Sequence, residues 1–200
     1  MGRTSTAHER LLDAACELLH DRGYSAVGVA EICARADVRK GSFYHFFASK
    51  QALTLAAVDA HWAVQQKVWR SVLGDAGEPP LEPPLERLRQ LLEAQAAAQR
   101  ADKAAGGSVR GCLLGNLALE LSGQEREIQA RLAAIFDEQA ALVLGVLAEA
   151  AATEAVAADA ETARALVAHL EGAVLLAKLA DDPAGLDGLW PAVRRLVRAD

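Results

Sequence analysis

The segment over residues 32–50, ICARADVRKGSFYHFFASK, constrains the fold of this chain more than any other segment does. Helix signals divide it into a helix that ends near Ala36, a tight turn at residues 37–38, and a short helix over about residues 39–47. Two helices joined by such a turn form a helix-turn-helix. We therefore expect the rest of the chain to hold and move this motif.

The second helix of the motif has one apolar face and one polar face. Phe43, Phe46 and Phe47 fall at spacings of three and four residues, so they can pack on the preceding helices. The residues left facing outward are a cation, a small hydroxyl and two rings with polar tips, namely Lys40, Ser42, Tyr44 and His45. This mixture suits a phosphate backbone and base edges better than it suits water. DNA is therefore the predicted partner of this face.

Gly41 interrupts the second helix at a position where alanine would favour the helix by roughly 1 kcal/mol. A close neighbour that excludes a β-carbon would account for the glycine, and that neighbour is either DNA or another helix. Arg39 and Lys40 stand at the beginning of the helix, where backbone amides without intrahelical partners favour an anion. Both cations therefore join the predicted DNA contacts.

The run over residues 38–50, VRKGSFYHFFASK, is similar to the recognition-helix signature of the TetR-type transcriptional repressors. The shared pattern is lysine-glycine-small, an aromatic pair around a variable residue, and a lysine after the next helix cap. This resemblance implies DNA contacts from Lys40, Gly41, Ser42, Tyr44, His45 and, on a phosphate, Lys50. Arg39 departs from the small or proline residue expected there, which leaves the base preference at that position open. The alternative interpretation is a helical interaction protein that does not bind DNA.

The composition favours an all-α chain. Of its 200 residues, 52% are hydrophobic and only 4% aromatic, and valine and isoleucine show no strand-like alternation. The net charge of −6 arises beyond residue 50, because the first 50 residues are nearly balanced. An acidic body argues against indiscriminate coating of nucleic acid and favours site-specific binding through a few placed cations.

Neither membrane insertion nor export is indicated. No apolar run approaches the length of a membrane span, and the N-terminal residues lack the apolar centre of a signal peptide. Cys16, Cys33 and Cys112 are odd in number and far apart, which indicates a reducing cytosol. We therefore expect a cytoplasmic protein. No phosphate loop, metal-ligand spacing or nucleophile elbow is present, so we expect no enzyme activity, metal or cofactor.

Helix signals predict about nine helices in two domains. We expect residues 1–48 to form a three-helix DNA-binding domain and residues 49–200 to form a larger helical domain, which the resemblance assigns to ligand binding and dimerisation. A capping box at Thr6 should begin the first helix, Gly23 should end it, and Ser49 should cap a long fourth helix. The predicted helices cover about residues 6–22, 27–36, 39–47, 50–73, 85–100, 111–122, 124–151, 161–179 and 187–198. A proline-rich segment at 75–84 is interpreted as a loop within the larger domain.

The segment over residues 111–122, GCLLGNLALELS, is the second informative stretch. Gly111 and Gly115 leave one side of this short helix nearly bare, so a ligand or another helix can come close. The run resembles the equivalent segment of a TetR subgroup that answers to small unsaturated compounds such as acrylate and maleimide-type electrophiles. Cys112 matches that subgroup's cysteine, and it is either a packing residue or a redox and electrophile sensor.

The helix over residues 161–179 is apolar nearly all round, which indicates burial on two faces. In a chain of this size the second face is expected to meet another subunit. The resemblance implies that this helix and the one over residues 187–198 pair with their copies as a four-helix dimer interface. A twofold homodimer would present two recognition helices to a palindromic operator.

These observations lead to one functional hypothesis. The chain is interpreted as a transcriptional regulator, a repressor that leaves its operator when a small-molecule inducer occupies the larger domain. Aromatic walls with a few polar groups make a small-molecule site. The predicted pocket residues are Trp62, Trp69, Cys112, Asn116 and His169.

Overall fold

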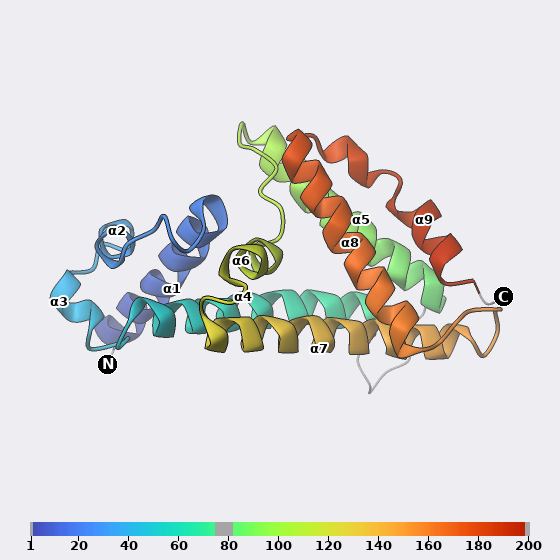
Figure 1. The fold of residues 1–200 in the computed structure, drawn as a ribbon, viewed down its shortest axis with the longest axis horizontal. Coiled ribbons are helices and arrows are strands. Elements are labelled where there is room, and N and C mark those ends of the chain that lie inside the picture. The colour runs from blue at the N-terminus through green and yellow to red at the C-terminus, as the bar shows by residue number, and fades with distance from the viewer. Residues whose placement is uncertain (1, 75–81, 199–200) are drawn as a thin grey trace. The chain divides into compact units, whose positions relative to one another are not determined.

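The computed structural model describes residues 2–74 and 82–198 (Figure 1). Within these residues the fold is all-α, as the sequence predicted, and the extended pairing there is limited to one isolated bridge between Val156 and Arg198. The elements are α1 (Gly2–Arg22), α2 (Val29–Arg35), α3 (Lys40–Phe43), α4 (Lys50–Leu73), α5 (Pro84–Ala104), α6 (Leu113–Leu121), α7 (Arg126–Ala150), α8 (Ala160–Ala180), the 3-10 helix η1 (Pro183–Leu186) and α9 (Leu189–Leu196). None of the described helices combines the length and the apolar character that crossing a membrane requires.

Two helix boundaries follow the sequence signals. Gly23 ends α1 with φ +81°, and its amide donates to the carbonyl of Leu19 at 2.9 Å. A left-handed residue at this position is the usual end of a helix, and glycine adopts it without strain. At the start of α4, the hydroxyl oxygen of Ser49 accepts a hydrogen bond from the amide of Ala52 at 3.0 Å. The predicted cap at Ser49 is therefore confirmed.

Two other boundary predictions are wrong. Thr6 does not cap α1, because the helix already begins at Gly2 and Thr6 lies inside it. The residues before Thr6 include no proline, so no missing backbone donor prevents the helix from extending back to Gly2. The helix predicted over residues 39–47 is shorter, with α3 ending at Phe43 and a tight turn following. In that turn the amide of Phe46 donates to the carbonyl of Phe43 at 2.9 Å, a three-residue spacing.

The described residues form two compact units. Unit 1 comprises residues up to 64 and residues 112–133, and so contains α1, α2, α3, α6 and the first part of α4. Within this unit α6 packs against α1 (Figure 1). Its core is built from fully buried apolar side chains, among them Leu11, Leu19, Ile32, Phe43, Leu53 and Ala57. The boundary predicted at residue 48 separates a DNA-binding domain from a ligand-binding domain. The two compact units do not test this functional division, so it stays a prediction.

Unit 2 comprises residues 65–111 and those from 134 onward, and it contains α5, α8, η1 and α9. The buried guanidinium of Arg87, on α5, donates to the carbonyl of Leu73 at the end of α4 and forms an ion pair with Glu149 of α7. This side chain satisfies a terminal carbonyl that has no intrahelical partner. The proline-rich loop predicted at 75–84 lies mostly outside the described residues, and Pro84 itself is the first residue of α5.

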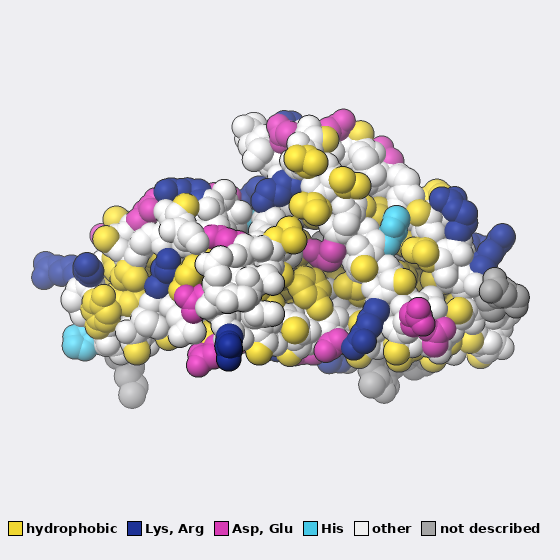
Figure 2. All heavy atoms as spheres, in the orientation of Figure 1, with side chains coloured by type: hydrophobic (Ala, Val, Ile, Leu, Met, Phe, Trp, Pro, Cys, Tyr) yellow, Lys and Arg dark blue, Asp and Glu magenta, His cyan; other side chains and the backbone are white. Residues whose placement is uncertain are grey.

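α8 has two apolar faces, as its sequence predicted. One face is buried within unit 2 and carries Leu166, Leu170, Val174 and Ala177. On the other face Leu176 is 65% exposed and Leu179 is 81% exposed. Figure 2 shows hydrophobic side chains gathered at the surface in the region that α8 occupies in Figure 1. Burial of the first face explains how the helix is held, and the second face is left uncovered in the single chain.

Candidate functional site

The turn between α2 and α3 is closed by backbone hydrogen bonds. The amide of Val38 donates to the carbonyl of Cys33 at 2.9 Å, and Asp37 between them adopts φ +52°. Asp tolerates this left-handed conformation better than most residues with a side chain do. The tight turn predicted at residues 37–38 is therefore present, and it fixes the direction in which α3 leaves α2.

α3 and the turn after it divide largely into the two faces that the sequence predicted, except that Phe46 is only half-buried. Phe43 and Phe47 are buried with ring centroids 5.9 Å apart, and the ring of His8 from α1 stacks on Phe47 at 5.1 Å. Tyr44 is 56% exposed, and the neighbouring side chain of His45 is exposed as well. In Figure 2 basic side chains and a histidine project from the region of α3. This face therefore combines positive charge with polar rings.

The remaining predicted contacts surround this face. Arg39 precedes α3 as its N-cap residue in extended conformation, and the side chains of Arg39 and Lys40 are both exposed. Ser42 is half-buried. Gly41 is exposed, and a β-carbon built there would meet no atom of the chain within 4 Å. Another helix of the described part of the chain therefore does not account for this glycine, and the close approach of DNA to it stays a prediction.

Lys50 is partly turned toward the interior of unit 1. Its Nζ donates to the carbonyls of Tyr24 at 3.0 Å and Val27 at 3.2 Å, and lies 3.8 Å from the centre of the Tyr24 ring. An ammonium group has three donors, and these carbonyls use two of them. The predicted phosphate contact would have to use the third. That contact stays a prediction.

Glu120 is a residue that the sequence did not connect to the helix-turn-helix. It lies on α6, and its carboxylate accepts hydrogen bonds from the amides of Tyr24 at 2.6 Å and Ser25 at 2.7 Å. The two partners are 96 and 95 positions away in sequence, so no local pattern could reveal the contact. Near the same turn, the hydroxyl of Tyr24 donates to Glu125 at 2.8 Å.

The five predicted pocket residues are divided between the two units. Unit 1 holds Trp62, Cys112 and Asn116, and unit 2 holds Trp69 and His169. Trp62 and Trp69 are buried. Cys112 and Asn116 share the first turn of α6, where the Cys112 sulfur accepts from the amide of Gly115 at 3.4 Å and the Cys112 carbonyl accepts from the amide of Asn116 at 2.8 Å. The structure thus brings these two residues together.

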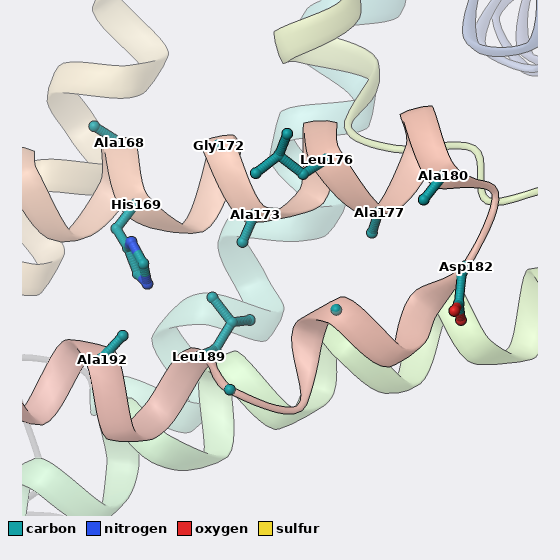
Figure 3. Close-up of a pocket in the computed structure, with 12 residues that line it drawn as sticks. Ala168, His169, Gly172, Ala173, Leu176, Ala177, Ala180, Asp182, Leu189 and Ala192 are labelled. Atoms are coloured by element: carbon teal, nitrogen blue, oxygen red, sulfur yellow. The ribbon is translucent and has the colours of Figure 1, made fainter.

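His169 lies in a groove of about 590 Å³ between α8 and the segment formed by η1 and α9. Figure 3 shows its ring between the two helices, pointing toward Ala192, while Ala173, Ala177 and Leu189 face the same space. Trp69 does not line this groove. The groove is walled by small apolar residues, so its surface is accessible to a side chain or a helix that packs closely.

Gln139 is a polar residue of unit 2 that the sequence analysis missed. It is buried on α7 in line with the buried side chains of Ile135 and Val143, and its Oε1 has no hydrogen-bond partner among the described residues. A glutamine at a position where helical spacing requires an apolar side chain is visible in the sequence, and could have been found there. A buried acceptor of this kind is satisfied by a donor from a buried water molecule or from another bound molecule.

The helix-turn-helix, with its exposed basic and aromatic face attached to a larger helical body, defines a DNA-binding regulatory protein. The chain belongs to the TetR family of transcriptional regulators. The sequence model described as "Bacterial regulatory proteins, tetR family" matches residues 11–57, and the model described as "Tetracyclin repressor-like, C-terminal domain" matches residues 84–193. It is therefore a DNA-binding regulator with a ligand-binding C-terminal domain, and the alternative of an interaction protein without DNA binding is wrong.

Known relatives agree with this assignment along most of their length. The transcriptional regulator AcuR of Cereibacter sphaeroides is 34% identical over 178 residues, which cover 88% of this chain and 78% of that protein. The HTH-type transcriptional repressor DhaR of a Mycobacterium species is 28% identical over 190 residues, covering 94% of this chain and 89% of DhaR. The crystal structure of a regulatory protein TetR from Rhodobacter sphaeroides superposes with a TM-score of 0.82 at 32% identity, covering 96% of this chain and 98% of that one.

Gly41→Ala separates the role of this glycine in DNA binding from its effect on the fold. Because a β-carbon at this position meets no atom of the chain, we expect thermal stability to stay the same or rise, by up to about 1 kcal/mol from helix propensity. We expect affinity for DNA to fall by about tenfold or more, because the new methyl group occupies the space that DNA needs. Differential scanning calorimetry and fluorescence anisotropy measure the two effects.

Gly145→Ala is the matched control. Gly145 is an exposed glycine inside α7, also without a neighbour within 4 Å of its added β-carbon, and it lies far from α3 in sequence. The control should gain similar stability and bind DNA like the wild type. Unchanged DNA affinity in Gly41→Ala would contradict the role proposed for Gly41.

Proposed function

We propose that this protein is a homodimeric repressor that binds a palindromic operator through α3 and leaves it when a small-molecule inducer occupies the C-terminal domain. The observation that carries this proposal is the exposed face of α3, where Lys40, Tyr44 and His45 surround a glycine with open space above it. Its place of action is the cytoplasm, where the DNA lies.

The side chains of this face have different tasks in the proposed complex. Arg39, Lys40 and Lys50 bind phosphates, which supplies affinity and orientation without reading sequence. Ser42, Tyr44 and His45 reach base edges in the major groove, where hydroxyl and ring nitrogen groups meet a distinct donor and acceptor pattern for each base pair. Because the phosphate contacts are few, affinity depends on the base contacts as well.

The proposed dimer interface is formed by α8 and α9. The exposed leucines of α8 and the groove beside them, lined by Gly172, Ala173 and Ala177, offer an apolar surface with small residues that allow close approach (Figure 3). A second copy of the same surface is its natural occupant, because a twofold interface is self-complementary. Pairing of this kind presents two copies of α3 to two half-sites on the same DNA.

Leu176→Glu tests this interface. A carboxylate at a position buried in the dimer lacks water and a partner, so we expect the protein to sediment near the mass of one chain, 21.1 kDa, rather than twice that mass. Affinity for a two-half-site duplex should fall by about a hundredfold or more, because the second binding event is no longer intramolecular. Sedimentation velocity at fixed protein concentration and anisotropy measure both effects.

Val64→Glu is the control for this substitution. Val64 lies on α4 and is 65% exposed, the same fraction as Leu176, so the change in charge and surface is matched. We expect this variant to remain a dimer. If Leu176→Glu also remained a dimer with unchanged DNA affinity, the proposed interface would be wrong.

The proposed inducer is a small unsaturated compound of the acrylate type. Trp62, Trp69, Cys112, Asn116 and His169 are the proposed pocket residues, and the similarity of residues 111–122 to the acrylate-responsive subgroup supports this ligand class. Gln139 adds a buried amide oxygen that would accept a hydrogen bond from the ligand or from a water molecule bound with it. In this mechanism the ligand has a higher affinity for the conformation in which the two recognition helices no longer match the spacing of the half-sites. Binding of the ligand therefore increases the population of that conformation, and the protein leaves the DNA.

Modification of Cys112 is a second candidate for the inducing event. The half-exposed Cys112 side chain stands at the N-cap of α6 and accepts from the amide of Gly115. A helix N-terminus favours negative charge, and the thiolate is the reactive form of cysteine. A maleimide would add covalently at this sulfur and displace the hydrogen bond that caps the helix.

Cys112→Ser distinguishes reversible binding from covalent sensing. We expect acrylate to lower the affinity of the wild type and of Cys112→Ser for operator DNA by similar factors, because a bound ligand does not need the thiol. Cys16→Ser is the control, since the sulfur of Cys16 donates to the carbonyl of Ala57 and burial raises its pKa to about 11, which keeps it unreactive. Loss of the response to both acrylate and N-ethylmaleimide in Cys112→Ser alone would favour the sensor.

A further inference from the structure

The amides of Tyr24 and Ser25 belong to the segment between α1 and α2, where backbone donors have no intrahelical acceptor. Both are bound by one side chain, because Oε2 of Glu120 accepts from Tyr24 at 2.6 Å and Oε1 accepts from Ser25 at 2.7 Å. Hydrogen bonds from amides to a carboxylate are charge-assisted and strongly directional. A single residue of α6 therefore holds the first residues of the segment that leads into the helix-turn-helix.

Gly23 makes room for this carboxylate. A β-carbon at position 23 would lie 2.5 Å from Oε2 of Glu120, and the residue adopts φ +81°, which side chains also disfavour. The glycine is thus required both by the end of α1 and by the close approach of α6. Where a side chain of residue 23 would stand, the carboxylate stands instead.

The same segment is held by the first residue of α4. Nζ of Lys50 donates to the carbonyls of Tyr24 and Val27, and it lies over the Tyr24 ring. The Tyr24 hydroxyl donates to Glu125, just beyond α6. Residues 24–27 therefore connect α6 with the beginning of α4, which directly follows the turn after α3.

Electrostatics favour the ionised carboxylate at this position. Burial raises the pKa of Glu120, but the amide hydrogen bonds of Ser25 and Tyr24 and the charge of Lys50 lower it further, so its net pKa lies below the ordinary value. The contribution of these bonds to stability is present above the ordinary pKa of a glutamate and is lost as the pH falls through the lowered value. Both amide bonds are therefore fully formed at neutral pH.

The N-terminal end of α6 directly follows residues of unit 2 in the chain. Gly111 directly precedes the N-cap residue Cys112, and its amide and carbonyl are both bound by the side chain of Gln99 on α5, at 3.0 and 3.1 Å. The amide of Val109 donates to Asp181, the residue that ends α8. A rearrangement of α5 or α8 around a ligand therefore acts on the residues from which α6 begins.

We propose that Glu120 is the positioning residue through which α6 controls the helix-turn-helix. This inference rests on the proposed function. Two directional bonds to one carboxylate break together when α6 shifts by about 1 Å, whereas apolar contacts between α1 and α6 survive such a shift. Release of Tyr24 and Ser25 frees the segment before α2, and with it the orientation of α3.

Reciprocity provides a test that needs no inducer. If α6 acts on the helix-turn-helix, then DNA bound to α3 must act on α6 with the same coupling free energy. The probe is a DNA duplex that the wild-type protein selects from a random library. Hydrogen exchange of the α6 amides, measured by mass spectrometry with and without this duplex, reports the coupling.

In the wild type we expect DNA to slow exchange in the C-terminal half of α6 by at least about fivefold. In Glu120→Gln, which replaces one acceptor oxygen by a donor facing an N–H, we expect a change of less than about twofold, with the variant still binding the duplex. Glu125→Gln is the matched control. It removes the same charge near the same turn, leaves the two amides untouched and keeps an amide oxygen that can accept from the Tyr24 hydroxyl, so it should respond like the wild type.

Each other outcome has a defined meaning. Failure of the wild type to select any duplex would overturn the proposed function and this inference with it. Selection of a duplex without any change in α6 exchange, or the same change in Glu120→Gln, would overturn the inference alone. Should Glu120→Gln not fold, Glu120→Asp takes its place, because it keeps the charge but shortens the side chain. If DNA slowed α6 exchange in Glu120→Asp as much as in the wild type, the inference would likewise be overturned.

Discussion

The burial of Phe43 and Phe47 is the constraint on which the recognition surface depends. α3 is a single turn of helix, so fixing Phe43 in the core of unit 1 leaves Lys40, Tyr44 and His45 no orientation except outward. The stacking of His8 on Phe47 joins α1 to the same cluster. Ser49, only two residues after Phe47, caps α4, so the aromatic cluster lies directly before the start of the long helix.

The second organising feature is that α6 lies in the same compact unit as the helix-turn-helix, although the two are far apart in sequence. Its carboxylate at Glu120 binds the segment before α2, and the residue before its N-cap is bound by Gln99 of α5. This gives the family's regulator architecture a physical connection that a chain-order division into two domains does not contain.

Much of the fold could be predicted from sequence because its signals are local. The turn at residues 37–38, the end of α1 at Gly23 and the cap at Ser49 each depend on residues within a few positions. The end of α3 was predicted less well: the helix ends at Phe43, whose carbonyl accepts from the amides of both Phe46 and Phe47 in the closing turn. Contacts between residues far apart in sequence could not be predicted at all. The partners of Glu120 lie 95 and 96 residues away, and nothing near Lys50 in sequence indicates that it binds two carbonyls.

The central claim, that α3 reads DNA, is tested most directly by fluorescence anisotropy with the selected duplex, using the wild type and Tyr44→Ala at two salt concentrations. Affinity should fall steeply between about 50 and 200 mM salt, because Lys and Arg release counterions from phosphates. Tyr44→Ala should weaken binding by about tenfold or more while its thermal unfolding stays unchanged, since Tyr44 is exposed. Binding that responds neither to salt nor to this substitution would contradict the account.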